Sequence, residues 1–253
     1  MLKFRIIPVL LLKDNKIVKG KQFQNYKTTG IPLTSFRTFS ALDSDELAFI
    51  NIGKGNNSIN DLISSLHKVS SECFIPLLAG GGITEISHVH QLFKAGADKV
   101  LITTSAFYNR SLLREAVDLY GSQSIVAGID YYEHDRPFVA INHGQNKIDT
   151  ITLEQYSCSL ESTGVGEIFL NCISRDGMMS GMDNNSPKLL LEHLSIPIIS
   201  CGGAGHVRHL KEHFNQTNVS AIACSSLFHF ADNNPIRIRS FLKNSMIPVR
   251  SLK

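Results

Sequence analysis

Eight short apolar runs alternate with amphipathic segments along this 253-residue chain. The runs cover residues 6–12, 47–52, 75–79, 99–104, 124–130, 167–172, 196–200 and 219–224. Between them, segments such as SINDLISSLHKVS and VRHLKEHF repeat apolar residues every three or four positions, as amphipathic helices do. Strands and helices that alternate eight times predict an α/β fold, a parallel (β/α)8 TIM barrel, in a single domain over residues 1–253.

The two halves of the sequence share one layout. Pro76, at the start of IPLLAGGG, and Pro197, at the start of IPIISCGG, are 121 positions apart. Glu46 and Glu167, in the stretches DELAFIN and GEIFLNC, have the same separation. A repeat of half the chain predicts a barrel built from two half-barrel repeats of four strands each. An open doubly wound sheet is the alternative, but it does not account for two equivalent halves.

The first apolar run, IIPVLLL, could be a membrane anchor, a secretion signal or a buried strand. Its seven apolar residues are too few to cross a bilayer, which takes roughly 20, and no small-residue cleavage site follows them. We therefore expect a buried strand rather than a membrane anchor or a secretion signal. The net charge of +3 comes from scattered Lys and Arg residues, so we also expect no nucleic acid partner.

The cysteines and histidines supply no metal-binding pattern. The cysteines are odd in number and include no C-x-x-C pair, which argues against a disulfide framework and a zinc site; they are Cys73, Cys158, Cys172, Cys201 and Cys224. We expect a cytoplasmic protein without metal or cofactor, with Cys201 and Cys224 in the core. Most histidines, including His213, fall on helix faces where solvated positions are expected. His134, in an insert expected to overhang the barrel mouth, is the exception.

Each half also carries a glycine turn between a strand and a helix, followed by hydroxyl residues at the end of the next strand. Glycines let the backbone approach a ligand, and the start of the following helix favours an anion. The matched pair predicts two phosphate cups, and hence a substrate with a phosphate at each end. The predicted phosphate-binding residues are Gly81, Gly82, Thr103 and Thr104 in the first half, and Gly202, Gly203, Ser225 and Ser226 in the second.

Charged residues at the beginnings of four predicted strands should meet inside the barrel. Inward and outward side chains alternate along barrel strands, so this parity directs the four to the amino-terminal floor. They are Arg5, Glu46, Lys99 and Glu167, two cations and two anions. Such a cluster is either a satisfied ring of ion pairs that closes the floor or a group of residues with a functional role.

Two aspartates are predicted at the opposite, carboxy-terminal mouth, where barrel enzymes carry out their chemistry. Asp130 ends the fifth strand, and Asp176 lies in the polar loop SRDGMMSG after the sixth. Beside two phosphate cups, a catalytic role is favoured over a capping role for Asp130, and Asp176 is a further catalytic candidate. The same parity points Leu11 of the first strand into the mouth.

Taken together, these residues resemble the cyclase subunit of imidazole glycerol phosphate synthase. The matching stretches KDNKIVKG, DELAF, AGGGI, GADKV, GEI, RDG, SGM and ISCGGAG are spread over most of the chain. The resemblance implies a heterodimer in which a class I glutaminase docks on the barrel floor. It further implies that ammonia passes through a charged gate and that a two-phosphate ribonucleotide is cleaved and cyclised at the mouth.

The resemblance also implies a role for each candidate residue. The floor cluster of Arg5, Glu46, Lys99 and Glu167 corresponds to the ammonia gate. Lys19 lies in a mobile loop that closes on the substrate, and Asp130 performs general acid/base work with Asp176 beside it. We expect a partner-binding surface on the floor that includes Asp98 and Gln123.

Four positions at the mouth depart from the family's pattern. The family has a second catalytic Asp where this chain has Leu11, and it differs also at Asn51, Thr103 and Asn171. We therefore favour a divergent paralogue that serves amidination of a nucleotide sugar in lipopolysaccharide or other surface-polysaccharide biosynthesis, beside a sugar amidotransferase. The alternatives are an authentic cyclase (lyase) of histidine biosynthesis and a sugar-phosphate isomerase of the related half-barrel family.

Overall fold

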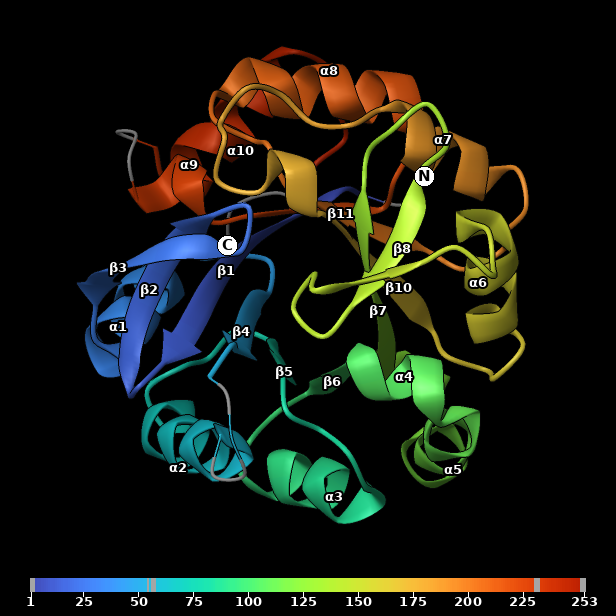
Figure 1. Cartoon of the computed structure of the whole chain (residues 1–253). Coiled ribbons are helices and arrows are strands. Elements are labelled where there is room, and N and C mark those ends of the chain that lie inside the picture. Colours follow the sequence, from blue (N-terminus) through green and yellow to red (C-terminus); the bar gives the residue numbers. More distant parts are fainter. Residues whose placement is uncertain (1–2, 54, 56–57, 230–232, 251–253) are drawn as a thin grey trace.

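Eight parallel strands close into a barrel in the computed structural model, which describes residues 3–53, 55, 58–229 and 233–250 (Figure 1). Each strand pairs with the next around the ring, and both the β12–β1 and the β7–β10 pairings are parallel. The barrel strands are β1 (Arg5–Lys13), β4 (Leu47–Asn51), β5 (Leu77–Gly80), β6 (Lys99–Ile102), β7 (Ile125–Tyr132), β10 (Glu167–Cys172), β11 (Ile198–Cys201) and β12 (Ala221–Cys224). The predicted TIM barrel is confirmed.

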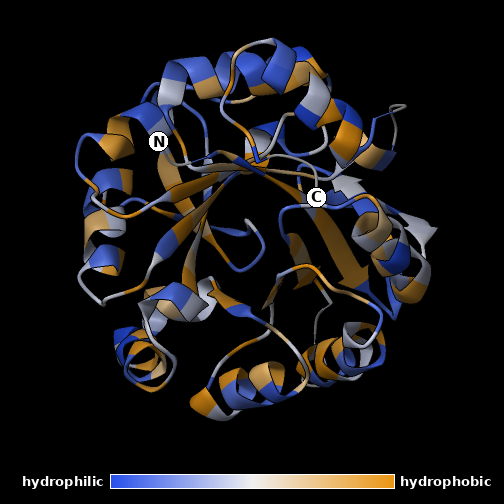
Figure 2. Cartoon of the chain, turned by 180° about the vertical axis from the view of Figure 1, so that it is seen from behind, coloured by the Kyte–Doolittle hydropathy of each residue, from blue (hydrophilic) through white to orange (hydrophobic). Residues whose placement is uncertain are grey.

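Helices surround the barrel and cover its outer face (Figure 1). They are α1 (Pro32–Ala41), α2 (Ser58–Ser70), α3 (Ile86–Lys94), α4 (Thr104–Tyr108), α5 (Arg110–Tyr120), α6 (Leu153–Glu161), α7 (Asn185–Leu191), α8 (Val207–Thr217), α9 (Ser226–His229) and α10 (Pro235–Asn244), with short 3-10 turns η1 (Ser122–Ser124) and η2 (Ile173–Arg175). Figure 2 shows hydrophobic strands inside a ring of helices that are banded with hydrophobic and hydrophilic residues. Among the described residues, no helix combines the length and apolar character that crossing a membrane takes.

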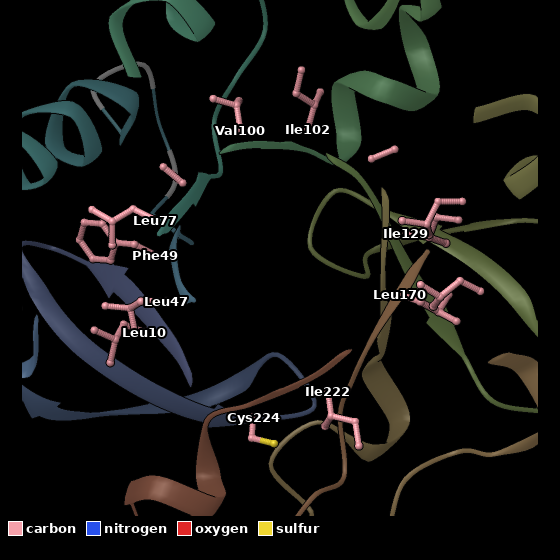
Figure 3. Close-up of a cluster of buried hydrophobic side chains, with 14 of the residues drawn as sticks. Leu10, Leu47, Phe49, Leu77, Val100, Ile102, Ile129, Leu170, Ile222 and Cys224 are labelled. Carbon is pink, nitrogen blue, oxygen red and sulfur yellow. The ribbon is translucent and has the colours of Figure 1, made fainter. Parts of the chain in front are cut away.

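Alternate residues of each strand serve two separate apolar layers. Outward-facing side chains such as Leu10, Phe49 and Ile129 pack between the strands and the helices (Figure 3). Inward-facing side chains fill the middle of the barrel: Ile7, Val9, Ala48, Leu78, Leu101, Val126, Phe169, Ile199, Ala221 and Ala223. The predicted parity is therefore confirmed, and an apolar layer separates the two ends of the barrel interior.

Two antiparallel hairpins extend the first barrel strand of each half. β2 (Lys16–Lys21) and β3 (Gln24–Gly30) continue from β1, while β8 (Phe138–Ile141) and β9 (Asn146–Ile148) continue from β7. Figure 1 shows both hairpins in front of the barrel, on the side where its strands end. The β2–β3 turn is Gln22–Phe23, whose positive φ angles of 49° and 61° are typical of two-residue hairpin turns. The longer β8–β9 turn, residues 142–145, begins with Asn142 and His143, whose φ angles are also positive, at 53° and 58°. These turns carry side chains over the mouth.

Candidate functional site

A cavity of about 300 Å³ opens at the carboxyl ends of the barrel strands. Inward parity and the loops after the strands bring together side chains that are far apart in the sequence. The predicted catalytic and phosphate-binding residues all line this cavity: Lys19, Gly81, Gly82, Thr103, Thr104, Asp130, Asp176, Gly202, Gly203, Ser225 and Ser226. The predicted juxtaposition is thus present, at the end of the barrel where enzymes of this fold place their active sites.

Asp130, near the carboxyl end of β7, is a half-buried carboxyl group at the cavity wall. Burial raises its pKa to about 7; the Asn171 amide, which donates a 3.0 Å hydrogen bond to Oδ1, opposes that shift, and the Asp176 carboxylate adds to it. An acid that titrates near neutral pH can both donate and accept a proton under ordinary conditions. The geometry therefore suits Asp130 to general acid/base chemistry.

Replacement of Asp130 by Asn is expected to stabilise the protein at pH 8 by about 1 kcal/mol. This is less than the full pKa shift would give, because the side chain is partly exposed and solvent screens its interactions. With a folded-state pKa of about 7 against an unfolded value of about 3.9, the folded wild type retains a proton that the unfolded chain has released. Wild-type stability therefore declines between about pH 4 and pH 7, whereas the Asp130→Asn variant lacks this decline. Urea unfolding at pH 4.5 and pH 8 measures the difference, and an equal gap at both values would contradict it.

The β2–β3 hairpin is fastened across the mouth by polar contacts. Lys19 Nζ lies 3.2 Å from Asp176 Oδ1, and both residues are buried. Gln22 donates from its backbone N to Asp176 O at 2.9 Å and from Nε2 to Ser174 O at 2.8 Å. A Cβ at Gly177, whose φ is +71°, would lie 2.2 Å from the Gly20 carbonyl oxygen, so this close approach requires glycine. The hairpin is closed over the cavity in this structure.

The glycine turns bring neighbouring backbones into contact beneath the cavity. A Cβ on Gly81 would lie 2.0 Å from Asn51 O, and one on Gly203 would lie 2.0 Å from Gly181 O. Both glycines have positive φ, at 99° and 93°. Glycine is therefore required here for packing, apart from any role toward a ligand.

The four charged residues predicted for the floor form a closed ring of ion pairs. Arg5 lies 2.9 Å from both Glu46 and Glu167, and Lys99 lies 3.1 Å from Glu46 and 3.2 Å from Glu167. The Glu46 side chain is only 3% exposed, and its Oε1 has no hydrogen-bond partner among the described residues. The ring sits below the apolar middle of the barrel, at the end opposite the cavity.

Residues 5–233 match the family of histidine biosynthesis proteins. The chain belongs to this family. A protein of Pseudomonas aeruginosa, provisionally named imidazole glycerol phosphate synthase subunit hisF2, is 38% identical over 235 residues, which cover 91% of this chain and 92% of that protein. The imidazole glycerol phosphate synthase subunits HisF of Bacillus pumilus and Prosthecochloris aestuarii are 32% and 34% identical over 99% of this chain and 100% of their own length. The resemblance seen in the sequence is confirmed.

In this member of the histidine biosynthesis family, Leu11 forms part of an apolar wall of the cavity. Leu11, Val9 and Ile50 all line it and pack in the barrel interior. The position at which the resemblance implies a second carboxylate therefore presents only hydrocarbon. Asn51, another departure, lines the cavity but uses its side chain locally, because Oδ1 accepts from Gly53 N at 2.8 Å and Nδ2 donates to Ser58 O.

The two residues predicted for a partner surface differ in how they are held. Asp98 is exposed, and its Oδ2 accepts a 2.8 Å hydrogen bond from Leu77 N, which ties the start of β5 to the loop before β6. Gln123, in η1, is exposed, and its Nε2 lies 3.4 Å from Tyr120 O. Both lie just before barrel strands and therefore at the floor end.

The histidine predictions need correction. His213, expected to be solvated, is fully buried on α8, where Nδ1 lies 2.6 Å from Asn184 Oδ1, and burial lowers its pKa to about 4. Helical periodicity alone did not separate the buried face from the exposed one at this position. His134 lines a second cavity beside the β8–β9 hairpin instead of the mouth. His143, at the tip of that hairpin, lines the main cavity, and nothing in the sequence singled it out.

Other cavity residues also lacked a sequence signal. Phe23 and Tyr26 reach the cavity from the β2–β3 hairpin. Burial raises the pKa of the Tyr26 hydroxyl to about 12, so it is a neutral hydrogen-bonding group. Cys201 and Cys224 pack against the apolar core as expected, and both also line the cavity. Burial raises the pKa of both thiols, which keeps them protonated and poorly nucleophilic.

Proposed function

We propose that this protein is an ammonia-using barrel of the imidazole glycerol phosphate synthase cyclase type. A class I glutaminase binds its floor as heterodimer partner, and ammonia released there crosses the barrel to a phosphorylated substrate in the cavity. The observation that supports this most strongly is the alignment of three layers along one barrel: the charged ring at the floor, the apolar middle, and the polar cavity.

The middle layer favours neutral ammonia over ammonium. An unpaired charge that enters an apolar interior loses its hydration, whereas a small neutral molecule does so at much lower cost. Alanines Ala48 and Ala221 contribute small side chains to this layer. In the proposed mechanism ammonia enters between the ion pairs of the floor ring. The apolar layer then keeps it from escaping into solvent.

At the mouth, Asp130 is the proposed proton donor and acceptor, because it titrates near neutral pH and lines the cavity. Lys19 and Asp176 form a buried pair that positions the hairpin over the substrate. No second carboxylate faces Asp130 from β1 among the described residues. The position on β1 where the cyclase is expected to have its second acid/base group therefore supplies none, because Leu11 occupies it.

The finer proposal is a divergent paralogue of the authentic cyclase. Under it, the barrel works in the cytoplasm beside a sugar amidotransferase and supplies ammonia for amidination of a nucleotide sugar in polysaccharide biosynthesis. Leu11 in the cavity wall supports this, as does similarity to a second-type subunit, hisF2. The alternative is an authentic cyclase of histidine biosynthesis, which is favoured by similarity to HisF subunits over nearly the whole chain.

Affinity purification of the tagged, full-length chain from its own cells separates these proposals. A class I glutaminase in roughly equal amount is expected under both. An additional amidotransferase-type enzyme would single out the paralogue, and its absence together with growth rescue of a strain lacking the cyclase would favour the histidine pathway. Purification without any glutaminase would reject the common proposal.

Gln123→Arg is expected to weaken binding of the glutaminase by about tenfold, or about 1.4 kcal/mol, without lowering the melting temperature of the barrel. Gln123 is exposed at the floor end, so a longer charged side chain meets the partner and not the core. Gln145→Arg, at an exposed position of the β8–β9 hairpin, is the matched control and should leave binding unchanged. Isothermal titration measures both, and equal affinities for the two variants would place the interface elsewhere.

A further inference from the structure

Two oxygen atoms at the barrel mouth are buried acceptors that the protein leaves without a donor. They are Asn171 Oδ1 and Asp176 Oδ2, and neither has a hydrogen-bond partner among the described residues. Both residues line the cavity, and Asp176 is only 7% exposed. An unsatisfied buried polar group costs about 1–3 kcal/mol, which a ligand with hydrogen-bond donors would recover. The two atoms therefore indicate a place for a ligand group rich in N–H or O–H donors.

The protein's own donors beside these acceptors are already in use. Asn171 Nδ2 donates to Asp130 Oδ1 at 3.0 Å, because the two residues lie opposite each other in the parallel pairing of β10 and β7. Lys19 Nζ donates to Asp176 Oδ1 at 3.2 Å. Each contact satisfies one oxygen of a carboxyl group and leaves the other, Oδ2, for a further partner. We call Asn171 Oδ1, Asp130 Oδ2 and Asp176 Oδ2 the acceptor site.

The charge around the acceptor site favours a cation or a neutral donor over an anion. Asp130 and Asp176 are the carboxyl groups among the described lining residues, and the Asp176 carboxylate is near enough to raise the pKa of Asp130. Lys19 is the single lysine or arginine among those residues, and its ion pair is with Asp176. A ligand group that brings N–H donors relieves the repulsion between the two carboxylates, whereas an anion would add to it.

The acceptor site lies where the interior path from the floor ends. β10 contributes one inward-facing residue to each layer: Glu167 to the floor ring, Phe169 to the apolar middle and Asn171 to the mouth. Phe169, Leu101 and Ala223 belong to the apolar middle and also line the cavity. The inner end of the cavity is therefore the top of the apolar layer, and a small neutral molecule that crosses this layer enters the cavity there.

We propose that the acceptor site receives the ammonia that arrives through the barrel and holds it by its N–H groups. The proposal rests on the proposed function, in which the barrel carries ammonia, and it assigns the receiving atoms. Ammonia has three N–H donors and one lone pair, so hydrogen bonds to these oxygens leave the lone pair free to attack a substrate. Asn171, a departure from the family's pattern, contributes one of the acceptors. Sugar hydroxyl groups also offer donors, but the paired carboxylates and the position above the apolar layer favour ammonia.

Titration of the full-length chain with ammonium chloride, followed by ¹³C NMR of the Asp130 carboxyl carbon at constant pH, tests the proposal. Potassium chloride is the matched ligand, because potassium has the charge and nearly the size of ammonium but no N–H group. We expect a saturable shift at millimolar ammonium and binding of potassium that is at least about fivefold weaker. Equal responses to the two salts would make this a general cation site, and a response to ribose but not to ammonium would assign the acceptors to hydroxyl groups. Either result would overturn the proposal, as would no response to either salt.

A pair of variants locates the site. Asn171→Leu removes one acceptor at nearly constant size and is expected to weaken ammonium binding by at least about fivefold. Asn146→Leu, the same replacement at an exposed position of β9, is the matched control and should leave binding unchanged. Equal affinities of the two variants would overturn the assignment. The comparison of ammonium with potassium on the wild type decides the question if Asn171→Leu does not fold.

The outcome for the acceptor site is independent of the outcome for the glutaminase. A chain that does not bind ammonium would leave the docking of a glutaminase on the floor standing, because affinity purification measures that separately. A chain that binds ammonium but no glutaminase would keep the acceptor site and reject the proposed source of the ammonia.

Discussion

Ammonia-dependent cyclisation of the imidazole pathway's two-phosphate ribonucleotide is expected to be about 10²–10⁴-fold slower with this chain than with a cyclase that has two acid/base groups. The reason is Leu11, which lines the cavity and cannot exchange a proton. Asp130 remains, with a pKa of about 7, but it works without a second carboxylate on β1. The expected loss corresponds to about 3–5 kcal/mol of activation free energy.

The assay uses the purified chain at high ammonium without any partner, so that the result does not depend on glutaminase docking. Turnover in the ordinary range of about 1–10³ per second would contradict the paralogue proposal and favour the histidine pathway. Leu11→Asp should restore little activity, because Thr103 and Asn171 also depart from the family's pattern at the mouth. Strong rescue by this single replacement would mean that the rest of the cavity still fits the cyclase substrate.

The second large effect is expected at the floor. Lys99→Ala removes a cation that pairs with both Glu46 and Glu167, and leaves a ring of two anions and one cation. We expect glutamine-driven amination by the assembled complex to fall by at least about tenfold, with amination driven by added ammonium largely retained. The ratio of the two rates measures how far ammonia release is coupled to its use.

Lys188→Ala, which removes an exposed lysine on α7, is the matched control and should leave the ratio unchanged. A melting curve separates lost coupling from unfolding, because Glu46, in a 3% exposed site, would keep Arg5 as its only ion-pair partner among the described residues and the loss of Lys99 lowers stability as well. Lys99→Arg keeps the charge and should retain most of the coupling. If a folded Lys99→Ala variant kept the wild-type ratio of glutamine-driven to ammonium-driven amination, the ring would have only a structural role.

The fold and the positions of most site residues were predictable from the sequence because both follow from simple periodicities. Period-two parity places Arg5 and Leu11 on the inner face of β1, and the structure has Arg5 in the floor ring and Leu11 at the cavity. The repeat of 121 residues pairs the two glycine turns, and both reach the same cavity. These features depend on the strand pattern, which is local and regular.

The features that could not be predicted from the sequence depend on contacts between distant segments. The Lys19–Asp176 pair joins positions 157 residues apart and forms only once the β2–β3 hairpin folds across the mouth. That hairpin was not predicted, because its turn residues Gln22 and Phe23 replace the Asn-Gly or Asp-Gly signal of a two-residue turn. His213 was misplaced because its burial depends on its contact with Asn184, which precedes α7. Tertiary contacts, not propensity, decided these positions.

The most direct test of the central claim is a titration of the class I glutaminase subunit of the same organism with the purified chain. The rate of glutamine hydrolysis is measured at each point of the titration. The proposed function predicts a one-to-one complex at micromolar concentration and a rise in glutamine hydrolysis of at least about tenfold on binding. Ultracentrifugation of the same mixture establishes the stoichiometry. No complex, with hydrolysis unchanged at saturating chain, would contradict the claim that this barrel receives its ammonia from a glutaminase.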